Sequence, residues 1–439
     1  MAWRPRQLGT GFARLWSAST AGNLGDGIGR VAVALLAARL TRDPLAVAAV
    51  TAIGYLPWLL LGLPAGALVD RYDRRRLAVA AGAVRTGAVA LLAAAAATDR
   101  ASLLLLYAVV LVLYTCETVY DNAMSSMVPM VVAERADLEH ANGRVQASRL
   151  VAESFVGPPL AGLVFVLAAG YAFGATVACY AAAVVLLFGL RGRFGAAVPA
   201  GDDPPAAARR PMRQEIIEGV RYLLEHPVHR RLLGVMIGIG FGGAMVNATM
   251  VLWVQDVLHV PESLYGVFGL TIAAGALAGS QSAAVLARRL GRGRTLRLAV
   301  ATVAAGAILA AATRSPYVAG AGLTIVGWAT LVFNVVNASL RQRLTPSALL
   351  GRVVGVYLSA TVGVMVVGSV VGGLLAAAGG LRLPWLLFGL GCAASAGWMV
   401  RGLDERIVGG AVEDADAAHT AGETTSTRPA TAEGEGSAA

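Results

Sequence analysis

The sequence predicts an all-α membrane protein in which twelve transmembrane helices form two similar six-helix bundles. Hydrophobic residues make up 57% of the chain and charged residues only 14%, whereas soluble domains carry roughly 25% charged residues. The mean hydropathy is +0.66, and the apolar residues gather in runs of about 20, the length that crosses a bilayer. Matching residues recur in the same order in the two halves of the chain, which indicates an internal repeat.

The apolar runs and the arginines between them predict the spans and their orientation. Most arginines fall in every second loop, and the positive-inside rule makes those loops cytoplasmic. Both termini are then cytoplasmic in a multi-pass protein of the cell (plasma) membrane. The arginines expected outside are few, namely Arg39, Arg42, Arg100, Arg314 and Arg382. The predicted spans are 12–39, 45–69, 77–98, 102–132, 142–169, 171–190, 231–258, 263–287, 295–313, 316–344, 352–378 and 382–402.

The spans divide the chain into four regions. Residues 1–190 are predicted to form the N-terminal six-helix bundle and residues 231–403 the C-terminal one. The cytoplasmic linker 191–230 holds an amphipathic helix over 215–225, where apolar residues follow helical spacing. Residues 404–439 contain too few apolar residues to fold and are expected to be a disordered cytoplasmic tail. Because one chain carries both bundles, a monomer is expected to suffice.

The repeat between the halves indicates a transporter architecture. An offset of 217 aligns Arg30 with Asn247, an offset of 215 aligns Thr115 with Thr330, and an offset of 211 aligns Gly157 with Gly368. Parallel repeats of this kind occur in secondary transporters, where the substrate binds near the bilayer midplane between the two bundles.

Composition argues against several other classes of protein. The net charge of +10 follows from the cytoplasmic arginines, so nucleic acid is not an expected partner. Cys116, Cys179 and Cys392 lie far apart in separate apolar runs, which does not suggest a disulfide framework, a metal site or a cofactor. The histidines lie in loops, at helix ends or in the tail, so the sequence predicts no enzyme and no catalytic residues.

A charged loop between the second and third spans carries the first specific signal. Residues 66–76 contain Gly66, Asp70 and Arg71, in a pattern that resembles the Gly-x-x-x-Asp-Arg loop of the major facilitator superfamily. Asp73 stands where that family usually has glycine. The Asp-Arg-x-Asp-Arg-Arg variant looks most like the branch that holds the enterobactin exporter and the macrolide efflux proteins.

The fifth predicted span carries the second signal, Gly157-Pro158-Pro159-Leu160-Ala161-Gly162. It resembles the Gly-Pro-x-x-Gly core of the antiporter motif in drug exporters of the superfamily. Proline bends a helix and small residues let neighbouring helices approach closely. The fourth span lacks the basic motif of many proton antiporters in the superfamily, and Arg85 and Arg149 are the only nearby substitutes.

The resemblance implies the major facilitator fold, transport by alternating access, and a set of gating residues. In that arrangement Asp70 faces the N-terminus of the eleventh span near Arg352, where the helix dipole favours a negative charge and the contact closes the cytoplasmic gate. The gating candidates are Gly66, Asp70, Arg71, Arg75, Gly157, Pro158, Gly162, Gly351 and Arg352.

Ionisable residues within the spans of the first half are the candidates for proton coupling. Each of three spans carries a pair spaced four apart, which places the two side chains on one helix face. Three arginines face four carboxylates, so one carboxylate is left over. Alternatively, the acids pair with arginines across helices and serve only structure. The proton-coupling candidates are Asp26, Glu117, Asp121 and Glu153, and their charge partners are Arg30, Arg85 and Arg149.

The corresponding faces of the second half are neutral, which suggests that protons bind to the first half and an amphipathic substrate to the second. The two tryptophans among the candidates could instead belong to the aromatic belt at the membrane surface. The substrate-cavity candidates are Tyr114, Thr118, Asn247, Trp253, Trp328, Asn334 and Asn337.

Together these observations predict a secondary active transporter of the inner or plasma membrane. We expect it to export amphipathic small molecules such as an antibiotic, another secondary metabolite or a siderophore, driven by inward proton flow. Its partners are then the substrate, protons and the lipid bilayer. Uptake or uncoupled facilitated transport of a small solute remains an alternative, as does a membrane receptor or scaffold that does not transport.

Overall fold

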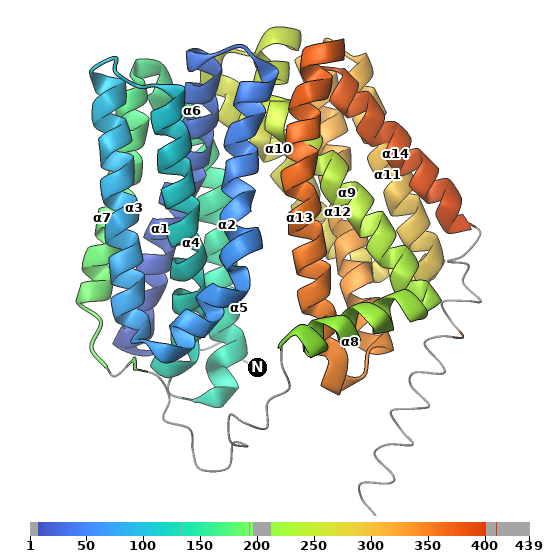
Figure 1. Ribbon diagram of the computed structural model, residues 1–439, viewed down its shortest axis with the longest axis horizontal. Coiled ribbons are helices and arrows are strands. Elements are labelled where there is room, and N and C mark those ends of the chain that lie inside the picture. The colour runs from blue at the N-terminus through green and yellow to red at the C-terminus, as the bar shows by residue number, and fades with distance from the viewer. Residues whose placement is uncertain (1–7, 133, 193, 196–211, 401–409, 411–439) are drawn as a thin grey trace, which may run out of the picture.

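The computed structural model describes residues 8–132, 134–192, 194–195, 212–400 and 410, and these are almost entirely helical (Figure 1). The first half consists of α1 (Gly9–Leu40), α2 (Pro44–Arg71), α3 (Arg74–Ala97), α4 (Leu103–Val131), η1 (Arg135–Asp137), α5 (Leu138–Leu150), η2 (Val151–Val156), α6 (Gly157–Leu167) and α7 (Ala169–Phe188). The second half follows with α8 (Met212–Glu225), α9 (Pro227–Leu252), η4 (Trp253–Val257), α10 (Glu262–Leu290), α11 (Arg292–Ala312), α12 (Pro316–Leu344), α13 (Ser347–Gly379) and α14 (Leu383–Val400).

Eleven helical segments of the described chain are long and apolar enough to cross a membrane. Two of them are continuous units that contain a π-helical turn: η2 lies inside Leu138–Leu167, and η4 forms the C-terminal end of Pro227–Val257. The twelfth span is α1, whose apolar content is lowered by Asp26, Arg30 and Arg39. It has 32 residues and packs between α6, α7 and α4. The predicted fold class is therefore confirmed.

The helices extend beyond some of the predicted spans because their polar first turns lie outside the apolar runs. The helix of the fifth span begins at Leu138 instead of residue 142, and α9 begins at Pro227 instead of residue 231. Proline at the first position of α9 suits a helix start, since the first N–H groups have no helical partner. The tail 404–439 and much of the linker lie outside the described residues, Gly410 excepted.

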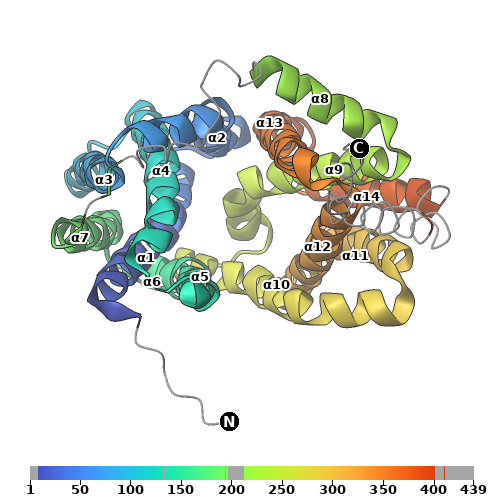
Figure 2. The ribbon, with the colours of Figure 1, turned by 90° about the horizontal axis from the view of Figure 1, so that it is seen from below.

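The two halves are joined mainly through two helix pairs. In the views of Figures 1 and 2, α1–α7 form one group and α9–α14 the other, with α2 against α13 and α6 against α10. We call the end that carries the turns near residues 41–43 and 258–261 the short-loop side, and the end where α1 begins the terminus side. In Figure 1, α2 and α13 lie side by side at the top, which is the short-loop side, and separate toward the bottom.

Glycine makes the contact between α6 and α10 possible. A Cβ atom at Gly266 would lie 1.7 Å from the backbone oxygen of Pro158, and one at Gly162 would lie 2.6 Å from the backbone oxygen of Ser263. Both distances are far below van der Waals contact, so neither position can hold a side chain while the helices pack this closely. The small residues of the Gly-Pro motif thus fit against the start of α10.

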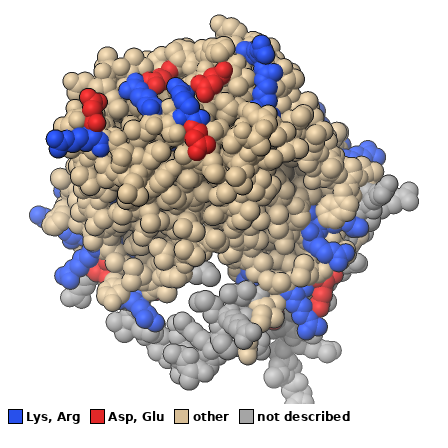
Figure 3. Space-filling view, turned by 45° about the horizontal axis from the view of Figure 1, so that its top comes forward, with Lys and Arg blue, Asp and Glu red and all other residues tan. Residues whose placement is uncertain are grey.

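Ion pairs between the halves complete the contact on the short-loop side. Arg39 Nε donates to both carboxylate oxygens of Glu262, at 3.0 and 3.1 Å, and Arg42 Nη1 lies 3.2 Å from Asp256 Oδ1. Figure 3 shows acidic and basic side chains gathered on this face, above a broad surface without charged residues. Such a band is suited to contact with lipid.

The corresponding contact on the terminus side is not formed. The Asp70 side chain is 77% exposed, and within the described residues its ion pair is with Arg74, at 3.8 Å. Arg352 Nη1 donates to Glu218 of α8 at 2.6 Å. The expected approach of Asp70 to the start of α13 is therefore absent in this conformation. The halves meet on the short-loop side, and the Asp70 loop is free on the other.

The linker helix α8 lies across α13 and α9 on the terminus side (Figure 2). Its Leu223 is fully buried against Val353 and Tyr357, and the Tyr222 hydroxyl donates to the backbone oxygen of Leu344 at 2.7 Å. The helix is therefore attached to the second half by both apolar packing and hydrogen bonding.

The glycine contact generates a prediction about conformation. Gly266→Ala should push α10 away from α6, because overpacking a tight contact costs about 1–3 kcal/mol, and the closed short-loop side should open about tenfold more often. The measurement is the rate at which an impermeant maleimide, added on the short-loop side, labels a cysteine placed at Val47 in a cysteine-free background. Gly391→Ala is the control, because its Cβ would meet open space. Equal labelling rates in all three proteins would contradict the expectation.

Candidate functional site

Seven charged side chains in the first half form one continuous series in which acids and bases alternate. Direct contacts join Arg85 to Asp26 and Arg30 to Glu153. Arg30 Nη2 lies 3.2 Å from Glu117 Oε1, and Arg85 Nη2 lies 3.9 Å from Glu117 Oε2. We call this series the ion-pair chain, and its order is Asp26, Arg85, Glu117, Arg30, Glu153, Arg149 and Asp121.

The far end of the ion-pair chain is made by Arg149. Its Nε donates to Glu153 Oε2 at 2.9 Å, and its Nη2 lies 3.4 Å from Asp121 Oδ2. Glu153 thus accepts from Arg30 through Oε1 and from Arg149 through Oε2. Each arginine is shared between two carboxylates, and only the two terminal acids have a single arginine.

Five elements supply these side chains, and local backbone structure brings them together. Asp26 and Arg30 share a face of α1, as expected for residues four apart, and Glu153 lies in the π-helical turn η2. Turns of this type often occur at functional sites. A Cβ at Gly27 would lie 2.6 Å from the Glu153 backbone oxygen, so this glycine lets α1 approach η2 closely enough for Arg30 to reach Glu153.

The Asp26 end is enclosed by aromatic residues. The Tyr180 hydroxyl donates to Asp26 Oδ1 at 2.7 Å and accepts from Arg85 Nη2 at 2.9 Å. The Arg85 guanidinium lies 4.3 Å from the centre of the Tyr180 ring and 5.3 Å from that of Tyr120, so cation–π attraction adds to the ion pair. Arg85 is 1% exposed and Asp26 is 6% exposed.

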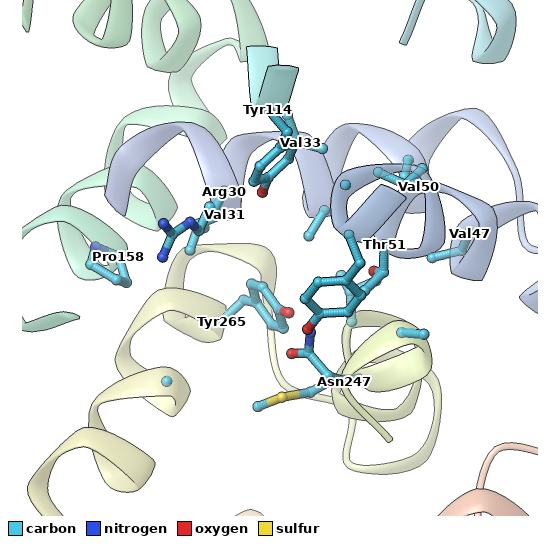
Figure 4. Close-up of a pocket in the computed structure, with 18 of the residues that line it drawn as sticks. Arg30, Val31, Val33, Val47, Val50, Thr51, Tyr114, Pro158, Asn247 and Tyr265 are labelled. Carbon is cyan, nitrogen blue, oxygen red and sulfur yellow. The ribbon is translucent and has the colours of Figure 1, made fainter. Parts of the chain in front are cut away.

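A cavity of about 540 Å³ borders the ion-pair chain between the two halves (Figure 4). The first half contributes Arg30, Glu117 and Arg149 to its wall, and Figure 4 shows the Arg30 guanidinium pointing into the space. The second half contributes Asn247, whose Nδ2 donates to the Tyr55 hydroxyl at 3.4 Å across the interface. Aromatic side chains complete the wall, namely Tyr55, Trp58, Tyr114 and Tyr265.

A second cavity of about 470 Å³ lies in the C-terminal half and has no charged residue in its described wall. Both cavities are bordered by Tyr55, Asn247, Met250 and Ile272, so they adjoin. The other polar and aromatic residues that line the second cavity include Thr330, Asn334, Thr361 and Phe388. A charged wall in the first half therefore lies opposite a neutral wall in the second.

Three of the predicted cavity residues line these spaces and four do not. Tyr114 and Asn247 border the first cavity, and Asn334 borders the second. Thr118 is buried and donates to the Tyr114 backbone oxygen at 2.9 Å, and Asn337 is buried with its Nδ2 3.2 Å from Met236 Sδ.

The two predicted tryptophans belong to helix packing and not to the cavities. Trp253 is fully buried, with its ring centre 4.8 Å from that of Trp385. Trp328 Nε1 donates to Ser282 Oγ at 3.0 Å. Neither tryptophan is in the wall of the cavities described above. Sequence reasoning missed Tyr55 and Tyr265, because no polar spacing pattern distinguishes their helix faces.

The predicted gating residues are distributed over both ends of the molecule. Arg75 donates from Nε to the Leu187 backbone oxygen at 3.0 Å and from Nη2 to that of Phe188 at 2.6 Å, which ties α3 to α7 within the first half. Arg71 is exposed, and Cβ atoms at Gly66 or Gly351 would meet open space. A Cβ at Gly157 would lie 2.8 Å from the Gly27 backbone.

The structure also shows the partners of the two acids of α4, Glu117 and Asp121. Glu117 contacts Arg30 and Arg85, and Asp121 contacts Arg149. Both acids are therefore paired across helices, as the structural alternative expected, although the series still contains one carboxylate more than arginines. The described residues include no cluster of three or more potential metal ligands.

The enclosed Asp26 end predicts a strong energetic coupling. Arg85→Gln should lower the unfolding temperature markedly, because removing one partner of a buried ion pair costs about 3–5 kcal/mol. The double variant Arg85→Gln/Asp26→Asn should regain much of this loss, since no unpaired charge remains at that end. Thermal unfolding of the purified proteins in detergent measures both effects. A double variant whose losses simply add would show that the pair is not coupled.

Comparison with known proteins agrees with this architecture. Residues 2–416 match the family described as transmembrane secretion effector, within the major facilitator superfamily. The multidrug efflux pump Tap of Mycolicibacterium fortuitum is 28% identical over 394 residues, which cover 86% of this chain and 93% of Tap. An MFS-type transporter of Mycobacterium tuberculosis is 39% identical over 94 residues, which cover 21% of each chain.

Solved structures show the same fold at low sequence identity. A bacterial homologue of the iron transporter ferroportin in an inward-facing state has a TM-score of 0.72 and 16% identity, covering 91% of this chain and 100% of that one. The nucleoside transporter NupG has a TM-score of 0.69 and 13% identity, covering 90% of this chain and 100% of its own. The chain belongs to the transmembrane secretion effector family of major facilitator superfamily transporters.

Proposed function

We propose that this membrane transporter is a proton-coupled exporter of amphipathic small molecules in the plasma membrane. The observation that carries the proposal is the ion-pair chain, which has one carboxylate more than arginines and forms part of the cavity wall. Substrates of the expected kind are an antibiotic, another secondary metabolite or a siderophore.

The surplus negative charge provides a means of coupling. A charge without a partner is costly in a membrane interior, and one proton on any of the four carboxylates leaves three arginines facing three carboxylates. Each arginine can then pair with a single acid, and two of the arginines, Arg30 and Arg149, line the cavity. Proton binding therefore changes the charge of the surface that meets the substrate.

The neutral wall of the second cavity supports the proposed substrate class, and the similar proteins support export as the direction of transport. The second cavity combines apolar surface with Asn334, Asn247 and Thr330, which suits a molecule with both apolar and hydrogen-bonding parts. Tap is described as a multidrug efflux pump, and the Gly-Pro-x-x-Gly pattern in α6 resembles that of exporters.

The orientation follows from charge. Arginines are frequent in the loops of the terminus side and few on the short-loop side, so we place the terminus side in the cytoplasm. The conformation described above is then closed to the outside by the α6–α10 contact and the Arg39–Glu262 pair. Export requires these contacts to break and the Asp70 end to close, and a single chain contains both gates.

Cells that lack their own exporters provide the first test. The protein should lower the accumulation of at least one compound from a panel of dyes, macrolides and siderophores, and a protonophore should restore accumulation. Glu117→Gln/Asp121→Asn should also restore it, because no surplus carboxylate remains. Glu225→Gln, which removes an exposed carboxylate of α8, is the control and should export normally. Export that survives both the protonophore and the double variant would refute proton coupling.

The Asp70 loop provides a separate test of gating. Asp70→Asn should slow transport about fivefold at unchanged protein level, because a carboxylate at a helix N-terminus contributes about 1 kcal/mol to the state in which the terminus side is closed. Asp99→Asn, at an exposed turn of the short-loop side, is the matched control. Equal transport rates for the two variants would contradict a gating role for Asp70.

A further inference from the structure

We infer that Asp121 is the carboxylate that binds the transported proton, and that Arg149 transmits its effect to the substrate cavity. The inference rests on the proposed proton coupling and identifies the residue that performs it. The proton comes from water on one side and returns to water on the other, and the only bond formed and broken is the O–H bond of the Asp121 carboxyl group.

Three of the four carboxylates in the ion-pair chain are well compensated. Asp26 contacts Arg85 and accepts the Tyr180 hydroxyl at 2.7 Å. Glu117 lies between two arginines and its side chain is 4% exposed. Glu153 accepts from Arg149 at 2.9 Å and from Arg30 through its other oxygen. Protonating any of these acids breaks a short charge-assisted hydrogen bond or two ion pairs.

Asp121 differs from the other three in both pairing and exposure. Its ion pair with Arg149 spans 3.4 Å, which is longer than a normal hydrogen bond, and no hydrogen bond to its carboxylate is found within the described residues. Its side chain is 19% exposed, compared with 13%, 6% and 4% for Glu153, Asp26 and Glu117. A proton on Asp121 therefore breaks one ion pair of 3.4 Å and no hydrogen bond found within the described residues, and it has the easiest access from water.

Charged groups of both signs surround Asp121. Arg149 on α5 and Arg85 on α3 attract its negative charge, whereas Asp26 on α1 and Glu153 on η2 repel it. Glu117, one turn earlier on α4, adds a third negative neighbour. The remaining element packed against α4 is α2, which has no ionisable side chain from residue 56 to residue 69. Negative neighbours thus outnumber positive ones.

Arg149 connects this proton site to the substrate. Its side chain is 39% exposed and lines the first cavity, whereas Asp121 is in the wall of neither cavity. When Asp121 is protonated, Arg149 pairs with Glu153 alone. The other two arginines can then each pair with one acid, and the ion-pair chain, three of whose members line the cavity, loses its surplus negative charge. Proton and substrate therefore occupy different places and communicate through one side chain.

Infrared spectroscopy of the purified full-length protein in lipid nanodiscs tests the site without a substrate. As the pH falls from about 8 to about 5, the wild type should gain the C=O band of one protonated carboxyl group. Ordinary carboxyl groups stay mostly ionised in this pH range. Asp121→Asn should lose this band. Glu153→Gln and the surface control Glu225→Gln should keep it.

Several results would overturn the assignment. A band that persists in Asp121→Asn, or a wild type without a band, would refute it, and a band lost in Glu153→Gln alone would move the proton to that residue. Asp121→Glu should keep the band at a shifted frequency, so the test survives if Asp121→Asn does not fold. Export that is sensitive to a protonophore, with the band on another acid, would refute only this inference. Export that is insensitive would refute the proposed coupling itself.

A charged thiol reagent tests the connection through Arg149. The test uses a protein whose only cysteine replaces Thr51 in the cavity wall. Lowering the pH should decrease the ratio of the reaction rate of a cationic methanethiosulfonate to that of an anionic one by roughly threefold to tenfold, as expected from the loss of one nearby negative charge. The ratio should not depend on pH in Asp121→Asn or in Arg149→Gln. A ratio that is independent of pH in the parent protein would refute the connection, as would an unchanged pH dependence in Arg149→Gln.

Discussion

A charge buried in a membrane must be compensated by the protein, and this constraint organises the first half of the molecule. Four carboxylates and three arginines from α1, α3, α4, α5 and η2 satisfy it by alternating along one continuous series. Because every arginine is shared between two acids, neutralising one acid allows the others to pair one to one. A chain of this kind is stable as a whole and can still respond to a single proton. In an isolated buried ion pair, by contrast, protonating the acid leaves the base without a partner.

The packing that holds the ion-pair chain also determines the conformation of the transporter. Gly27 and Gly157 bring α1 against η2 and α6, and the same α6 meets α10 through Gly162 and Gly266. The ion-pair chain and the α6–α10 contact of the short-loop side are therefore joined by one helical unit, Leu138–Leu167, with a π-helical turn at Glu153. Glu153 therefore lies on the same element that contacts α10, which gives a direct physical route between the ion-pair chain and that contact.

The sequence predicted those features that depend on local pattern. Apolar runs predicted most helices to within a few residues, and the spacing of four placed Asp26 with Arg30 and Glu117 with Asp121 on common faces. Partners across helices depend on helix rotation, which one sequence does not contain. For this reason Trp253 and Trp328 were expected in the cavity but pack between helices, and Tyr55 and Tyr265 were missed. The absent contact of Asp70 reflects the conformation, which no sequence pattern encodes.

The most direct test of the account is uphill transport by the purified protein in liposomes. A compound identified in the cell assay is placed at equal concentration on both sides, and a pH gradient is imposed as the only driving force. The account predicts that the compound accumulates on the acidic side while protons move the other way, and that Asp121→Asn still equilibrates the compound but cannot concentrate it. Equilibration without accumulation by the wild type would contradict the claim that the surplus carboxylate of the ion-pair chain couples transport to protons.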